Sequence, residues 1–96
     1  MIQGVGLNRQ VAARLAAQRL AEWRQLGYDD WCAMLNDREL RQAVVDDGKL
    51  YNIVSYALNE GDGRVRLVVA VDDGGWSAMA PLTLVEIMRS DGTFLH

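Results

Sequence analysis

The sequence predicts an α+β two-layer sandwich, in which an N-terminal helix and a short second helix pack on an antiparallel meander sheet of about four strands. One observation is that helical apolar periodicity is confined to the start of the chain, and short strand-like runs follow it. The other is that glycine-containing loops too short for a parallel crossover separate these runs, so neighbouring strands should pair antiparallel. Because 96 residues suffice for one core, we expect a single domain over residues 1–96.

The first predicted element is a helix over residues 8–26. At about 100° per residue, one side of it collects the apolar residues Ala12, Ala13, Leu15, Ala16, Leu20, Trp23 and Leu26. Asn8 is the expected N-cap, and Gly27 is the expected left-handed residue that ends the helix. Arg19 projects within the apolar arc. Either its aliphatic stem packs there while its head reaches water, or it binds an anionic partner.

A short helix is expected over residues 28–35, capped by Asp29, with Trp31, Met34 and Leu35 turned inward. Residues 37–45 are compatible with a helix or a strand. We predict a strand, because the hairpin-type turn at residues 46–49 follows at once and glycine supplies the positive φ it needs.

Further strands are predicted at residues 50–58, 64–71 and 76–80, and Pro81 stops the last of these. Glycine-rich loops at residues 59–63 and 72–75 separate them. The following segment, residues 82–88, is only weakly periodic, and residues 90–93 form one more turn.

The C-terminal third carries a recognisable pattern. Its residues are the run Val71-Asp72-Asp73-Gly74-Gly75-Trp76, then Ala78 and Pro81-Leu82, then Asp91-Gly92-Thr93-Phe94. This V-D-D-G-G-W...P-L...D-G-x-F pattern resembles the C-terminal signature of a family of small uncharacterised bacterial proteins. The resemblance favours a hairpin over residues 38–58 and implies no particular activity. The chain departs from the family in its alanine-rich first helix and in Leu50, Val54 and Tyr56, where more polar residues are usual.

Composition argues against several classes of partner. The formal net charge is -3, from 13 acidic and 10 basic residues, and no basic stripe is present, which argues against nucleic acid. The longest apolar run, residues 67–71, is far short of the roughly 20 residues that span a bilayer, which argues against a membrane. One cysteine, Cys32, and an N-terminus without signal-peptide features favour the cytoplasm.

No catalytic constellation is recognisable, so we expect neither an enzyme nor a cofactor. The single histidine is His96 at the end of the chain, and Cys32 is expected to fill space in the core. The Asp72-Asp73-Gly74-Gly75 run has carboxylates that could face a cation. We interpret it as a turn and expect no metal, because further oxygen ligands at regular offsets are missing.

The strongest functional indication is that both faces of the two central strands are apolar, although one helix covers only one face. We therefore predict a contact surface on the second face, where a second copy in a homodimer or another protein binds. Its candidate residues are Leu50, Val54, Tyr56, Leu58 and Val68. The alternative is that residues 82–96 fold across this face and bury Leu84, Ile87 and Phe94 there.

A second hypothesis is a small-ligand site between the first helix and the sheet. It rests on the number of aromatic side chains and on arginines that would anchor a polar group. The candidate residues are Arg19, Trp23, Tyr51, Arg66 and Trp76. The alternative for the aromatic residues is ordinary core packing.

Overall fold

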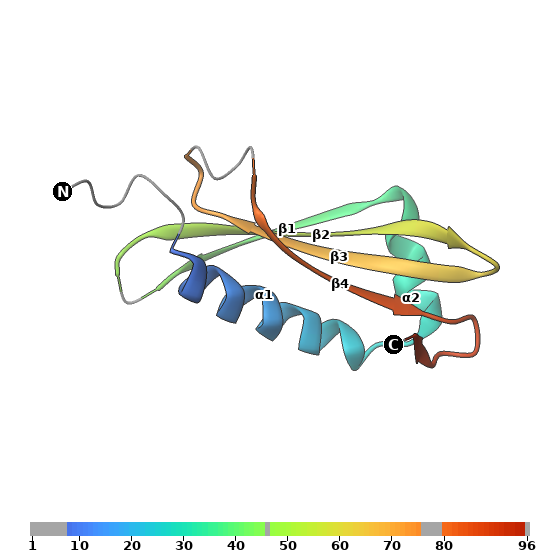
Figure 1. The fold of residues 1–96 in the computed structure, drawn as a ribbon. Coiled ribbons are helices and arrows are strands. Elements are labelled where there is room, and N and C mark those ends of the chain that lie inside the picture. The colour runs from blue at the N-terminus through green and yellow to red at the C-terminus, as the bar shows by residue number, and fades with distance from the viewer. Residues whose placement is uncertain (1–7, 46, 76–79, 96) are drawn as a thin grey trace.

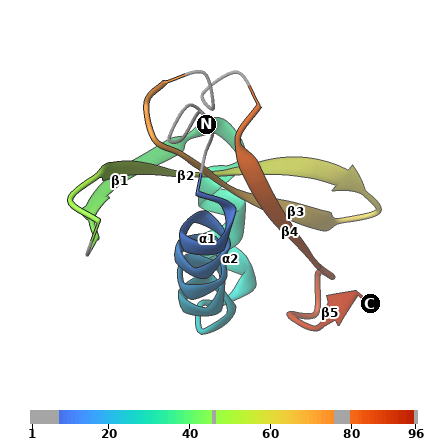
Figure 2. The same cartoon turned by 60° about the vertical axis from the view of Figure 1, so that its left-hand side comes forward.

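The computed structural model describes residues 8–45, 47–75 and 80–95. It confirms the α+β prediction, with five strands rather than about four, in the order β1-β2-β3-β4-β5. The elements are α1 (Arg9–Arg24), α2 (Tyr28–Cys32), the short 3-10 helix η1 (Ala33–Asn36), β1 (Arg38–Val44), β2 (Leu50–Gly61), β3 (Arg64–Asp72), β4 (Leu82–Met88) and β5 (Phe94–Leu95). Figures 1 and 2 show α1 and α2 on the same side of the sheet.

Helix α1 begins as predicted and ends differently. The side chain of Asn8 accepts a hydrogen bond from the Val11 N–H and caps the helix. Gly27 is not left-handed: its φ of -88° and ψ of 178° are extended, and it holds the N-cap position of α2. The carboxylate of Asp30 accepts from the Gly27 N–H, so this pair, and not Asp29, begins the second helix.

The core lies between the helices and one face of the sheet. This face carries the odd-numbered residues of β2 and β3. Burial alternates from residue to residue over the first eight positions of β2, whereas residues 67–71 of β3 are all buried. Trp23 and the fully buried Trp31 fill the space beneath α1. The indole N–H of Trp23 donates to the Ser55 hydroxyl at 3.0 Å, and that of Trp31 donates to the Trp23 carbonyl at 2.8 Å. Both large rings are therefore buried with their polar atoms satisfied.

The ambiguous segment at residues 37–45 is strand β1, paired antiparallel with β2 from Arg38 opposite Tyr56 to Val44 opposite Leu50. The turn that follows has Gly48 at a φ of +77°, as predicted, although Asp46 lies outside the described residues. In the β2–β3 hairpin, Asp62 and Gly63 have φ values of 55° and 76°, the signs that a type I′ turn requires.

The C-terminal part differs most from the prediction. The weakly periodic segment forms β4 and pairs with β3, and β5 pairs with the end of β4. The predicted strand at residues 76–80 falls largely outside the described residues, and Ala80 lies in a bend. Leu84 and Phe94 pack on the helix side, where the Phe94 ring is 5.8 Å from that of Trp31.

Candidate functional site: the outer face of the sheet

The face of the sheet opposite the helices, which we call the outer face, is ordered in rows by the strand register. One row runs from Leu40 through Val54 and Ala70 to Thr83. The next runs from Arg38 through Tyr56 and Val68 to Val85. Residues directly opposite one another on adjacent strands share a face and lie in contact distance, so these rows place apolar side chains of four strands side by side.

The apolar side chains in the middle of this face form a continuous patch, the outer apolar surface. It consists of Leu40, Val54, Tyr56, Leu58, Val68, Ala70, Val85 and Ile87. Its rim is open to solvent, because Leu40 is 61% exposed and Leu58 and Val85 are each 46% exposed. Its centre, at Val68 and Ala70, is already buried by the neighbouring side chains. Such a patch, exposed at its edges and packed at its centre, is typical of a surface that binds another surface.

Polar groups border this surface along the strands. At one end, the Gln42 side-chain amide donates to Asn52, and that of Asn52 donates to Asp72, both at 3.0 Å. At the other end, Arg66 makes two hydrogen bonds to the Glu60 carboxylate, at 2.6 and 2.8 Å. An apolar centre with a polar border is the anatomy of protein–protein interfaces.

Four of the five predicted contact residues belong to the outer apolar surface. The fifth, Leu50, is on the same face but lies beyond the Gln42–Asn52–Asp72 ladder, beside Val44. The other four members, Leu40, Ala70, Val85 and Ile87, were not among the predicted contact residues. The alternation of β1 would have revealed Leu40, whereas Val85 and Ile87 belong to a strand that was not predicted.

The alternative cover for this face is wrong. Residues 82–88 lie within the sheet as β4, and Leu84 and Phe94 face the helices. Only Ile87, of the three residues expected to be buried there, projects to the outer face, and it does so as part of the outer apolar surface. The C-terminal strands therefore extend this surface instead of burying it.

The structure places Arg19 and Trp23 in contact but separates Arg66 from these two predicted ligand-site residues. Trp23 and Tyr51 are core residues on the helix side. Arg66 lies on the outer face, because its even-numbered position in β3 has the opposite parity to the helix-side residues Val65, Leu67 and Val69. Trp76 lies outside the described residues. Arg19 is buried and occupied: its guanidinium bonds Glu39 at 2.7 and 3.0 Å and Glu22 at 3.0 Å. It also stacks over the Trp23 ring at 4.7 Å.

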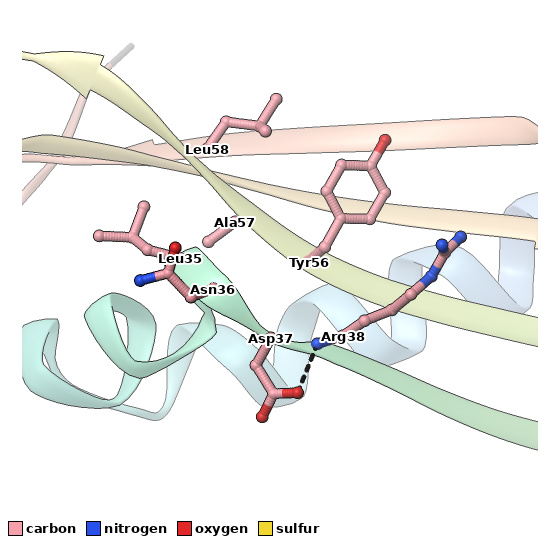
Figure 3. A pocket seen from close by; sticks show the side chains of 7 residues that line it. All are labelled: Leu35, Asn36, Asp37, Arg38, Tyr56, Ala57 and Leu58. Atoms are coloured by element: carbon pink, nitrogen blue, oxygen red, sulfur yellow. Dashed lines mark hydrogen bonds between the residues drawn. The ribbon is translucent and has the colours of Figure 1, made fainter.

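Two hollows adjoin the sheet. An open groove of about 620 Å³ runs beside the outer apolar surface, between η1 and the β1–β2 pair (Figure 3). Its lining residues are Leu35, Asn36, Asp37, Arg38, Tyr56, Ala57 and Leu58. In it the Asp37 carboxylate accepts from the Arg38 backbone N–H at 2.7 Å. A smaller hollow of about 230 Å³ lies between α1 and β1 and includes Arg19, Glu22 and Arg41.

Three side chains have shifted pKa values, and local burial and hydrogen bonds cause each shift. Burial, and then the hydrogen bond to Asp47, raise the pKa of Tyr51. A hydrogen bond with Cys32, followed by burial, raises the pKa of Tyr28. Hydrogen bonds from Thr93 lower the pKa of Asp91 in the last turn. These groups lie in separate parts of the molecule, so they do not compose an acid–base pair.

The described ranges hold neither a metal cluster nor a membrane-spanning helix. No group of three or more His, Cys, Asp or Glu residues in them is placed to hold a metal ion. No helix in them is long and apolar enough to cross a membrane. Comparison of the chain with family models, curated proteins and solved structures finds no match.

Proposed function

We propose that this chain is a non-enzymatic protein-interaction and self-assembly module whose outer apolar surface binds the same surface of a second copy. The observation that carries the proposal is an apolar patch continuous over four strands, with Leu40, Leu58 and Val85 about half exposed or more. Removing apolar area from water contributes about 25 cal/mol per Å² before the entropy cost of association is deducted. A cytoplasmic setting is part of the proposal, supported by the single cysteine and the composition.

Charge at the two ends of the surface supports a second copy as the occupant. Asp72 lies at one end of the outer face of β3, and Arg64 and Arg66, the latter paired with Glu60, lie toward the other end. A twofold axis that runs across the strands reverses their direction, and it therefore places the Asp72 end of one copy over the Arg66 end of the other. The central Val68 and Ala70 then face each other, and the two sheets pack as in an aligned sandwich.

The test is the solution mass, measured by size-exclusion chromatography with light scattering between about 1 and 500 μM chain. We expect wild-type protein to exceed the 10.7 kDa of a single chain. Leu58→Glu and Val54→Glu place a charge in the interface and should reduce the mass, because an unpaired charge is costly to bury.

Leu26→Glu is the matched control. Leu26 is 41% exposed, close to the 46% of Leu58, but it follows α1 and is not part of the outer face. It should leave the mass unchanged. A wild-type monomer at all concentrations would contradict the proposal, and so would assembly that survives both substitutions in the outer apolar surface.

A further inference from the structure

Among the described residues, no strand pairs with the outer edge of β1. This strand stands at the end of the strand order, and its seven residues pair with β2 in a continuous register without a bulge. The single proline of the chain, Pro81, is elsewhere. Natural sheets usually protect an edge with proline, a bulge or charged side chains, since an open edge binds further strands. β1 has charges, and their order along the strand decides which strand it accepts.

The backbone groups that face this edge follow from the adjoining hairpin. The Val45 N–H donates to the Lys49 carbonyl at 3.3 Å, so this pair is of the hydrogen-bonded kind. Because the two kinds of pair alternate along an antiparallel ladder, the odd-numbered residues of β1 turn their backbone groups toward β2. Arg38, Leu40 and Gln42 therefore direct theirs away from the sheet.

The side chains of β1 are complementary to a second, antiparallel copy of themselves. In the register centred on Leu40, the two Leu40 residues lie opposite each other on the outer face. Glu39 of each copy then lies opposite Arg41 of the other, on the helix side. Registers centred on Glu39 or Arg41 would oppose like charges, and the register centred on Gln42 would oppose Arg41 to Ala43. Opposite charges directly across a strand pair stabilise it and like charges destabilise it.

We propose that β1 pairs with β1 of a second copy about a twofold axis at Leu40, joining two sheets into one of ten strands. The outward backbone groups of Arg38 and Gln42 form hydrogen bonds across this junction, as do those of the two Leu40 residues. The charged groups around Glu39 are compatible with this register. Both Arg19 bonds to Glu39 end on Oε1, and the Arg41 of the same chain lies 3.5 Å from that oxygen and is 51% exposed. The Arg41 of a second copy can therefore approach Oε2.

This edge contact is independent of the outer apolar surface. Its twofold axis is perpendicular to the sheet, so both outer apolar surfaces remain on the same side and stay open. Leu40 belongs to that surface, and edge pairing therefore makes one continuous patch from two. If both contacts form, four copies assemble as two ten-stranded sheets that pack face to face.

Gln42→Pro tests the edge contact. The Gln42 N–H points away from β2, so proline removes an outward donor and obstructs a neighbouring strand while it leaves the β1–β2 ladder in place. Gln42→Ala is the matched control, because it loses the same side-chain bond to Asn52 and keeps the N–H. We expect Gln42→Pro to halve the solution mass of wild-type protein, whereas Gln42→Ala leaves it unchanged. Circular dichroism confirms that each variant is folded.

A charge exchange tests the register. Arg41→Glu and Glu39→Arg each oppose like charges across the junction, so each variant alone should lose edge pairing. At positions 39 and 41, the Arg41→Glu variant has two acidic side chains and the Glu39→Arg variant has two basic ones. An equimolar mixture places these acidic and basic pairs opposite each other, and it should recover the mass. Arg41→Glu protein that assembles as the wild type does would overturn the register centred on Leu40.

The two proposals fail separately. Wild-type protein with both contacts has the mass of four chains, and either Gln42→Pro or Val54→Glu reduces it to two. An unchanged mass for folded Gln42→Pro overturns the edge contact and leaves the outer apolar surface standing. An unchanged mass for Val54→Glu overturns the contact through the outer apolar surface and leaves the edge contact standing. A wild-type monomer overturns both proposals.

Discussion

At the scale of single residues, buried polar contacts hold α1 in position on the sheet. Ser55 is fully buried on the helix side of β2, where its hydroxyl accepts the Trp23 indole N–H. Ser55→Ala removes the acceptor and leaves a buried donor without its partner, which should lower the free energy of unfolding by about 1–3 kcal/mol. Urea unfolding measures the loss.

A double-mutant cycle isolates this bond from the packing of the indole ring. Trp23→Phe is destabilising because it loses ring volume and the donor together. Ser55→Ala should cost less when Trp23→Phe is already present, since no donor remains to be left unsatisfied. Additive losses from the two substitutions would mean that the hydrogen bond contributes nothing measurable.

Ionisation of Tyr51 should lower the free energy of unfolding at alkaline pH. The Tyr51 side chain is fully buried, and burial together with its hydrogen bond to Asp47 raises its pKa in the folded state. The proton is therefore held more tightly in the folded chain than in the unfolded chain, where the pKa is about 10. The contribution of protonated Tyr51 to the free energy of unfolding is complete below pH 10. It is lost as the pH rises from there through the raised pKa. Unfolding free energies between pH 8 and 11 should fall more steeply for wild-type protein than for Tyr51→Phe.

At the scale of elements, two hairpin glycines with the same backbone conformation have different surroundings. Gly48 and Gly63 have φ values of +77° and +76°. A Cβ on Gly48 would meet no atom within 4 Å, whereas a Cβ on Gly63 would lie 3.3 Å from the Ser90 Cβ and near the Tyr28 hydroxyl, which bonds the Gly63 carbonyl.

Gly48→Ala should therefore cost only the strain of a left-handed alanine, about 1–2 kcal/mol. Gly63→Ala carries the same strain together with displacement of Ser90, and it should cost more. Thermal unfolding of the two variants gives the comparison. Equal losses would show that Ser90 moves away from the β2–β3 hairpin at no measurable cost.

The elements that the sequence predicted well are those with local signals. α1 has an apolar arc and an N-cap, and β1 was assigned from the glycine turn that follows it. β4 gave a weak pattern because its helix-side positions include Glu86, a buried carboxylate that bonds Arg24 of α1 at 2.6 Å. This charge looks like a surface residue in sequence, and only the tertiary partner explains its burial.

The candidate site was predictable only in its central strands. The two-sided apolar pattern of β2 and β3 located Val54, Tyr56, Leu58 and Val68 on one face, as the register confirms. The extent of the surface depends on which strands flank these two, and that is a property of pairing between distant segments. The separation of Leu50 from the other predicted contact residues could not be foreseen for the same reason, since the polar ladder between them spans three strands.

At the scale of the whole molecule, one layer of helices covers one face of a five-stranded sheet. The valines of β3 are buried on both faces, yet only the helix side has a covering layer among the described elements (Figure 2). Sheets with two apolar faces are normally covered on both. A second copy over the outer apolar surface supplies the missing layer without lengthening the chain.

Assembly of this kind makes thermal stability depend on protein concentration. Association draws the equilibrium toward the folded state by mass action, so a 100-fold increase in chain concentration stabilises a dimer by about 2.7 kcal/mol. Spread over the unfolding entropy of two chains of this length, that shift raises Tm by about 7 °C. Differential scanning calorimetry at 5 and 500 μM measures it.

Val54→Glu should unfold at a lower temperature, because it lacks the partner layer. If the edge contact is also blocked by Gln42→Pro, the double variant should show no dependence on concentration. A wild-type Tm that stays constant across this range would mean that the outer apolar surface stays open in solution.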